Sequence, residues 1–243
     1  MAWASPATAT ATSKPRSIKA WITNKYKDDP QSFDTMEMIS TKLCLVTVGA
    51  TASFERLICQ VLNEPFLAQL AKYHYTHLLV QYGKNGEQIW NGFNEKFPPG
   101  CEQLHGITVG GFDFKPDLWR YMRMAVKERN QDLGIIISHA GMACNIFFDS
   151  IKLTHVSGTG TILDALRLAL PLIIVPNPDL ADNHQEDLAV EMEQMKYAVR
   201  ADIEDLITAL DTAEAQAPEQ LSRPHGPEDA LAGLVSDQLQ DVD

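Results

Sequence analysis

The chain has 243 residues, 45% of them hydrophobic and 21% charged, which is enough for one α/β domain with a sizeable core or two small ones. Its formal net charge of −12 argues against a nucleic-acid binder that holds phosphates on a basic surface. No apolar run approaches the roughly 20 residues that a membrane-spanning helix needs. The four cysteines lie far apart without a C-x-x-C pair, which favours a reducing compartment over a disulfide framework or a zinc site.

The first 41 residues are expected to form a disordered leader. Ala, Thr and Ser dominate this segment, and no acidic residue precedes Asp28, whereas Arg16, Lys19 and Lys25 are basic. The same composition fits an organellar transit peptide, and a start codon placed too early in the gene explains it equally well.

Between Lys42 and Leu210, short apolar runs alternate with segments that have apolar residues at helical spacing. This alternation predicts an α/β domain over residues 42–210, in which a Rossmann-like parallel sheet has helices on both faces. In chain order the predicted elements are a strand at Leu43–Val48, helices at Phe54–Leu62 and Pro65–Lys72, strands at His77–Gln81 and Ile107–Val109, a helix at Pro116–Arg129, a strand at Leu133–Ser138, a helix at Gly160–Leu170, a strand at Leu172–Val175, and helices at Asn183–Met195 and Asp202–Leu210.

Residues 211–243 are expected to form an acidic tail with room for one short helix at Glu228–Leu239, which would be marginal alone in water. From Asp179 onward the sequence has seventeen acidic residues and three basic ones, so the negative charge belongs to the C-terminal third. A solvated face and tail explain such a run of charge.

Three segments that follow predicted strands have the residue types of an anion site. The first is Val48–Phe54, where Gly49, Thr51 and Ser53 lie between a strand and a helix. Small residues there let a ligand approach the backbone, and the free N–H groups of a helix start attract anions. Glycine and serine are also ordinary turn and cap residues, so a structural role explains them equally well.

The second segment, Ile137–Gly141, places Ser138 and His139 at the end of the most apolar strand. Open α/β sheets bind ligands at such strand ends. The segment is not a nucleophile elbow, because G-x-S-x-G is absent. His139 can donate a hydrogen bond to a phosphate or satisfy a neighbouring carbonyl, and taken alone it favours the structural role.

The third segment, Gly158–Leu166, begins a predicted helix with Gly-Thr-Gly-Thr, whose N–H and hydroxyl groups can bind a diphosphate. Asp164, one turn later, can accept hydrogen bonds from two ribose hydroxyls or act as a first-turn acid. After the next strand, Asn177–Gln185 supplies amides and an imidazole that suit sugar hydroxyls. Walker A and G-x-G-x-x-G motifs are missing, so P-loop and ordinary dinucleotide interpretations lack support.

Taken together, these motifs resemble those of a known family. In chain order, VTVGATASFERLI, IIISHAG, GTGTILDAL and PLIIVPNPDLADNHQEDLA look like the catalytic subunit of the two-subunit UDP-N-acetylglucosamine (UDP-GlcNAc) transferase of dolichol-linked oligosaccharide synthesis. That family is similar to the donor-binding, C-terminal half of the bacterial lipid II N-acetylglucosaminyltransferase, a GT-B enzyme of glycosyltransferase family 28. The resemblance spans about residues 42–210 and implies the fold of that half.

The resemblance implies a role for each matching residue. The diphosphate would be surrounded by His139, Gly141, Thr159, Gly160 and Thr161, the ribose held by Asp164, and the sugar faced by Asn183, His184 and Gln185. Gly49, Thr51 and Ser53 would lie across the cleft, on the acceptor side. Asp164 and Asp187 stand where the family usually has Glu.

The resemblance also implies an inverting transfer of GlcNAc to dolichyl-diphosphate-GlcNAc, which adds the second sugar of the lipid-linked oligosaccharide for protein N-glycosylation. In the family the other half of the cleft is a separate, membrane-anchored subunit, so the chain is expected to be active only in a heteromer. We expect the partner to supply the general base, and we expect no metal or other cofactor. The expected location is the cytosolic face of the endoplasmic reticulum, with a free cytosolic pool. The expected docking patch is Leu206, Ile207, Leu210, Leu231 and Leu234.

Met142–Gly158 interrupts the family motif by seventeen residues, and without it the sequence reads SHAGTGTILDAL. We interpret this insertion as a retained intron of 51 nucleotides, because the codons can hold a GTATG donor at Gly141–Ala143, a CTAAC branch site at Leu153–Thr154 and an acceptor at Ser157–Gly158. The rival interpretation is a genuine lid over the donor, although long loops without structure of their own are uncommon in compact domains.

Three functions remain open at this point. The first is glycosyl transfer within a heteromer. The second is a non-catalytic nucleotide-sugar-binding or scaffold subunit, inactivated by the interruption at 142–158. The third is a generic α/β nucleotide-binding enzyme that shares only the fold. Transfer in the presence of the partner favours the first, binding without transfer the second, and absence of UDP-GlcNAc binding the third.

Overall fold

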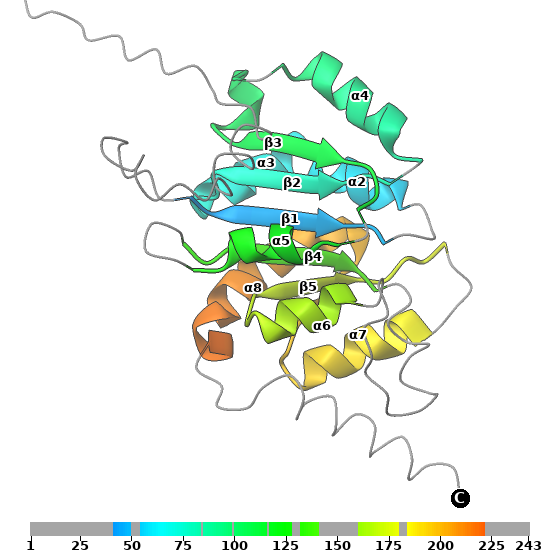
Figure 1. The fold of residues 1–243 in the computed structure, drawn as a ribbon, viewed down its shortest axis with the longest axis vertical. Coiled ribbons are helices and arrows are strands. Elements are labelled where there is room, and N and C mark those ends of the chain that lie inside the picture. The colour runs from blue at the N-terminus through cyan, green and yellow to red at the C-terminus, as the bar shows by residue number, and fades with distance from the viewer. Residues whose placement is uncertain are drawn as a thin grey trace, which may run out of the picture.

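The computed structural model describes residues 41–49, 54–83, 85–98, 100–115, 117–127, 132–140, 160–179 and 184–221. These residues form one six-stranded sheet with the order β3-β2-β1-β4-β5-β6, in which every neighbouring pair is parallel (Figure 1). The predicted α/β fold with a parallel sheet is therefore confirmed. The strands are β1 (Leu43–Thr47), β2 (His77–Gln81), β3 (Thr108–Phe112), β4 (Ile135–His139), β5 (Leu172–Val175) and β6 (Val199–Arg200).

Helices cover both faces of this sheet. In Figure 1, α5, α6 and α7 lie in front of it, and α2, α3 and α8 lie behind it. The helices are α2 (Glu55–Val61), α3 (Glu64–Lys72), α4 (Glu87–Lys96), α5 (Trp119–Met122), α6 (Gly160–Arg167), α7 (His184–Gln194) and α8 (Leu206–Leu221), with 3-10 turns η1 (Glu102–Leu104), η2 (Arg123–Ala125) and η4 (Ile203–Asp205).

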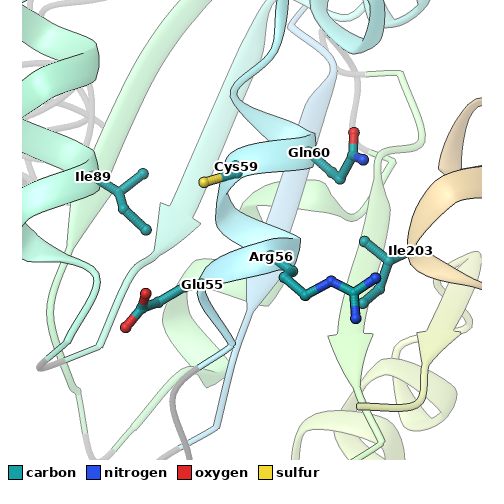
Figure 2. Close-up of a pocket in the computed structure, with 6 residues that line it drawn as sticks. All are labelled: Glu55, Arg56, Cys59, Gln60, Ile89 and Ile203. Carbon is teal, nitrogen blue, oxygen red and sulfur yellow. The ribbon is translucent and has the colours of Figure 1, made fainter. Parts of the chain in front are cut away.

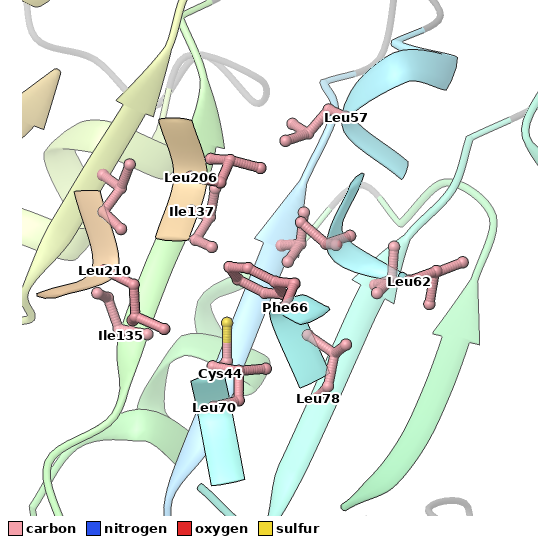
Figure 3. Close-up of a cluster of buried hydrophobic side chains, with 14 of the residues drawn as sticks. Cys44, Leu57, Leu62, Phe66, Leu70, Leu78, Ile135, Ile137, Leu206 and Leu210 are labelled. Carbon is pink, nitrogen blue, oxygen red and sulfur yellow. The ribbon is translucent and has the colours of Figure 1, made fainter. Parts of the chain in front are cut away.

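The core lies in two layers, one on each face of the sheet. Successive side chains of β1 enter different layers, because side chains alternate along a strand. Cys44 and Val46 pack with α2, α3 and α8, and Leu43 and Leu45 pack with α5, α6 and α7. Figure 3 shows Phe66 of α3 within the first of these layers. A parallel sheet buried on both faces explains why its strands read as continuous apolar runs.

The predicted single helix at Pro116–Arg129 is wrong. The described part of this segment forms the four-residue helix α5 and then η2, and Val126 has extended backbone angles. The amide of Gly134 donates to the carbonyl of Ala125 at 2.8 Å, and a β-carbon at Gly134 would lie 2.2 Å from the carbonyl oxygen of Leu43. This close packing against the sheet interrupts the helix that the apolar pattern favours.

Helix α4 and strand β6 are not among the predicted elements, and β3 is longer than predicted. Helix α4 packs through Phe93 and Trp90 at the β3 edge of the sheet. The indole of Trp90 lies against Gly111 of β3, where a β-carbon would come within 2.8 Å of the ring. Gly111 therefore makes room for an aromatic ring rather than ending the strand.

The last described helix also differs from the prediction. Helix α8 continues to Leu221, past the expected domain boundary at Leu210, because Ala209 and Ala213 extend its buried face along β5 and β6. Leu206 and Leu210 are buried in the core, so they are not part of a docking patch; Ile207 is 37% exposed.

The leader up to residue 40, the insertion at 142–158, and the tail from 222 onward, with Leu231, Leu234 and Glu228–Leu239, lie outside the described residues. The helices in the described ranges are all too short or too polar to cross a membrane.

Candidate functional site

The candidate site lies where the strand order reverses, between β1 and β4. The chain leaves these neighbouring strands toward opposite faces of the sheet, and ligands of open α/β sheets bind at such a position. Gly49 follows β1 with φ +78°, and a β-carbon on it would lie 3.5 Å from Nδ1 of His139, the last residue of β4. The structure thus brings together one residue predicted for the acceptor side and one predicted for the diphosphate.

His139 is only 6% exposed, and its imidazole and the ring of Phe54 form a T-shaped pair with centroids 5.2 Å apart. Burial lowers the pKa of His139, while hydrogen-bonding interactions with the side chain of Gln185 and the backbone of Val48 raise it to a smaller extent. Burial therefore favours the neutral imidazole in the free protein. Among the described residues the buried Nε2 atom has no hydrogen-bond partner. An unpaired buried polar atom costs about 1–3 kcal/mol, so we take it as a sign of a ligand at this edge.

Two hydroxyl groups fix the backbone beneath this imidazole. Thr47 and Ser138 pair across β1 and β4, and the Thr47 hydroxyl donates to that of Ser138 at 3.2 Å. The Ser138 hydroxyl in turn donates to the carbonyl of His139 at 3.1 Å. Because Ser138 is buried and its proton is engaged, it acts as a support and not as a nucleophile.

Helix α6 begins at Gly160, on the same edge of the sheet. It connects the parallel strands β4 and β5, so its N-terminus lies at their carboxyl ends and its first N–H groups face the site. Thr161 is half-buried in the first turn. Asp164 follows one turn later, and its Oδ1 lies 3.2 Å from Nη1 of Arg167. Gly141 and Thr159 are outside the described residues.

Burial is the main cause that raises the pKa of the Asp164 carboxyl. Arg167 opposes this shift, and Asp117, in the connection between β3 and α5, adds to it. Asp164 is thus partly withdrawn from water and has a positive and a negative neighbour. A shielded carboxylate of this kind can accept hydrogen bonds from sugar hydroxyls.

Helix α7 begins at His184, and Gln185 in its first turn points inward. Its side chain is 7% exposed, and its Oε1 accepts a hydrogen bond from the amide of Asn177 at 3.1 Å. That oxygen therefore holds the connection after β5, whereas the prediction has Gln185 facing the sugar. Of His184 only the backbone is described, and Asn183, Thr51 and Ser53 lie outside the described residues.

Two residues of this region were not predicted. Gln81 ends β2 at 1% exposure, and its Oε1 has no partner among the described residues. Its signal in the sequence is a polar residue that closes an apolar strand. Asp117 accepts a hydrogen bond from the amide of Trp119 at 2.9 Å at the start of α5, and no sequence motif marks it.

A separate hollow of about 430 Å³ lies beside α2 (Figure 2). Arg56 pairs with Glu204 at 2.5 Å and with Asp179 at 3.9 Å next to it. The predicted donor-binding residues are absent from its lining, so we do not place the donor there. The lining residues are Glu55, Arg56, Cys59, Gln60, Ile89 and Ile203.

Residues 149–233 match the glycosyltransferase family 28 C-terminal domain. The UDP-N-acetylglucosamine transferase subunit ALG13 of Kluyveromyces lactis is 32% identical over 191 residues, covering 70% of this chain and 85% of that protein. The chain belongs to the ALG13 family. The ALG13 of Saccharomyces cerevisiae is 30% identical over 162 residues, covering 67% of this chain and 78% of the relative.

A solved structure supports the same assignment. The NMR solution structure of an ALG13 protein superposes with a TM-score of 0.51 at 26% identity, covering 79% of this chain and 94% of that one. The resemblance drawn from the four sequence motifs and the predicted fold class are thus confirmed. The family 28 match begins inside the segment 142–158 and includes Gly160, Asp164 and Gln185.

Proposed function

We propose that this chain is the donor-binding subunit of a heteromeric glycosyltransferase that moves GlcNAc from UDP-GlcNAc to dolichyl-diphosphate-GlcNAc. The observation that carries the proposal is the buried Nε2 of His139, which has no hydrogen-bond partner among the described residues and lies at the sheet edge where α6 begins. The names of the ALG13 relatives, which are UDP-N-acetylglucosamine transferase subunits, support the donor. The product would be the second sugar of the lipid-linked oligosaccharide for N-glycosylation.

The diphosphate would lie between His139 and the first turn of α6. The N–H groups of Gly160 and Thr161, in the first turn of α6, would donate to an anion there, and the helix dipole would favour its charge. The anion also favours the imidazolium form of His139, whose Nε2–H can then donate to a phosphate oxygen. Donors held in place in this manner stabilise the charge that develops on the departing UDP.

The other parts of the donor would have separate contacts. Asp164, one turn into α6, would accept from the ribose hydroxyls. The start of α7, with Asn183 and His184, would face the GlcNAc ring. Gln185 would support the site without contacting the donor, because its side chain holds the connection after β5 in place.

The acceptor side would be completed by a membrane-anchored partner subunit. The acceptor hydroxyl oxygen would bond to C1 of GlcNAc while the bond from C1 to the UDP oxygen breaks, with inversion at C1. The proton of the hydroxyl would pass to a base on the partner. The complex would work at the cytosolic face of the endoplasmic reticulum, in equilibrium with a free cytosolic pool of this chain. The reaction as proposed uses no metal and no nucleic acid.

The test compares the full chain alone with the chain co-purified with its partner subunit. We expect calorimetry to show UDP-GlcNAc binding to the chain, and labelled GlcNAc to reach dolichyl-diphosphate-GlcNAc only in the complex. His139→Ala should abolish transfer and weaken binding about tenfold or more, the loss of a charge-assisted hydrogen bond. The control is His74→Asn at an exposed position with φ +62°, which asparagine tolerates.

Three results would contradict the proposal. Transfer by the chain without its partner would show that the cleft is complete in one polypeptide. Absence of UDP-GlcNAc binding in the complex would mean that the chain shares only its fold with the transferase subunits. Binding without transfer in the complex would instead identify a non-catalytic nucleotide-sugar-binding subunit.

A further inference from the structure

Asp164 and Arg167 form an ion pair on one face of α6. Residues three apart on a helix are neighbours, and Nη1 of Arg167 lies 3.2 Å from Oδ1 of Asp164. The carboxylate is 24% exposed and the guanidinium 40% exposed. The hydrogen bond from Arg167 is accepted by Oδ1, which leaves Oδ2 for other donors.

A second charge reaches Asp164 from another part of the fold. Asp117 lies at the start of α5, fixed by its hydrogen bond from the amide of Trp119, and α5 packs against α6. Its negative charge opposes ionisation of Asp164, as does burial, whereas Arg167 favours ionisation. The state of the Asp164 carboxyl is thus a balance between Arg167 and two opposing effects.

Among the described residues, the other charged or basic side chains on the elements that pack against α6, namely α5, β4 and β5, are Arg120 on α5 and His139 at the end of β4; Arg123 follows α5 on η2. The guanidinium of Arg120 lies over the ring of Tyr121, 5.4 Å from its centroid. The charges that shift the pKa of Asp164 are those of Arg167 and Asp117.

We propose that Arg167 is a positioning residue for donor binding: it holds Asp164 ionised and fixes its orientation, so that the free oxygen accepts hydrogen bonds from the ribose hydroxyls. The inference deepens the proposed function and rests on it. Aspartate is one methylene shorter than the glutamate that the resembling family usually has. The Asp164 carboxylate therefore reaches the ribose hydroxyls only in a favourable rotamer, which the ion pair with Arg167 holds. The negative charge of Asp117 opposes ionisation of Asp164, so it increases the need for the positive charge of Arg167.

The experiment measures the ratio of the dissociation constants of 2′-deoxy-UDP and UDP for the full chain between pH 4.5 and pH 8. Protonation of His139 affects both ligands alike through their diphosphates, so the ratio reports on the contact with the ribose. We expect the parent to prefer UDP by about tenfold, as one hydrogen bond to a charged group implies. This preference should fall at acid pH as Asp164 protonates.

Three variants separate positioning from general structure. Arg167→Met should lose most of the preference for UDP, and the remaining preference should decline at a higher pH than in the parent. Arg167→Lys should restore much of the preference. In Asp117→Asn the decline should begin at a lower pH than in the parent. The matched control is Arg123→Met, which removes an exposed arginine that does not shift Asp164 and should behave as the parent.

A carbon NMR titration of the Asp164 carboxyl in the ligand-free variants gives a second readout. An unchanged ratio and an unchanged titration in Arg167→Met would overturn the inference. Normal UDP binding with no preference over 2′-deoxy-UDP in the parent would overturn it as well, while leaving the proposed function intact. Absence of UDP and UDP-GlcNAc binding in the parent would overturn the proposed function itself.

Discussion

The ammonium group of Lys42 lies 2.9 Å from both carboxylate oxygens of Glu214, which joins the residue before β1 to helix α8. The two side chains are only 12% and 19% exposed. The hydroxyl of Tyr75 also donates to Glu214, at 2.5 Å, and the Lys42 ammonium lies over the Tyr75 ring. This cluster fastens the last described helix to the sheet.

Replacing Lys42 by methionine should lower the free energy of unfolding by about 2 kcal/mol, because it leaves the Glu214 carboxylate shielded from water without its cation. The control is Arg56→Met, which breaks the exposed pair with Glu204, 48% and 64% exposed, and should cost about 0.5 kcal/mol or less. Urea unfolding of both variants measures the difference. Equal losses would mean that the Lys42 pair is no stronger than a surface pair.

Alanine at Gly49 should weaken UDP-GlcNAc binding as well as the fold. The positive φ is strained for alanine, at about 1 kcal/mol, and the new methyl would occupy the space beside Nδ1 of His139, in van der Waals contact at 3.5 Å, where the donor is proposed to bind. The control is Gly106→Ala, because Gly106 has a similar φ of +80° but open space around its β-carbon. Thermal unfolding should show a similar loss in both variants, whereas calorimetry should show weaker binding only for Gly49→Ala. Weaker binding in both would trace the effect to stability alone.

Donor binding should be accompanied by uptake of a proton at His139. The pKa of His139 is lowered in the free protein, and a bound diphosphate raises it, so the affinity should fall as pH rises through the pKa of the complex. Calorimetry near neutral pH in buffers with different ionisation enthalpies measures the uptake. His139→Gln should bind without it. The same lowered pKa makes the free chain lose stability as pH falls, because the unfolded chain binds the proton more readily.

Removing residues 142–158 should strengthen UDP-GlcNAc binding. The deletion restores the continuous motif SHAGTGTILDAL and shortens the connection between His139 and Gly160, which the proposed site needs side by side. Calorimetry on the full chain and the deletion variant makes the comparison, and sequencing of the spliced transcript shows which form the cell makes. Weaker binding after deletion would favour a genuine lid.

The sequence predicted well those features that depend on local patterns. The apolar run around Ile135–His139 marks β4, and parallel topology then places Gly49 and His139 at one edge of the sheet. It predicted poorly what depends on contacts between distant segments. The continuation of α8 beyond Leu210 requires packing on β5 and β6, which no local pattern reports.

In the candidate site, too, local patterns located some residues, whereas contacts between distant segments were not predicted. Asp164 was located by its place one turn into a helix with a Gly-Thr start. Its neighbour Asp117 comes from a different connection and meets it only through packing of α5 on α6. The inward turn of Gln185 depends on the backbone amide of Asn177, whereas the sequence suggested only that this segment contacts a sugar.

The order of the strands has a consequence for synthesis of the chain. On the ribosome, β2 and β3 can join β1 as soon as they emerge, but the other side of β1 has no neighbour until Ile135–His139 has been translated. During that interval Leu43–Thr47 presents an unpaired apolar edge that another nascent chain can join. Translation that stalls before Ile135 should therefore leave an aggregation-prone fragment, and this interval is when a chaperone would protect the chain.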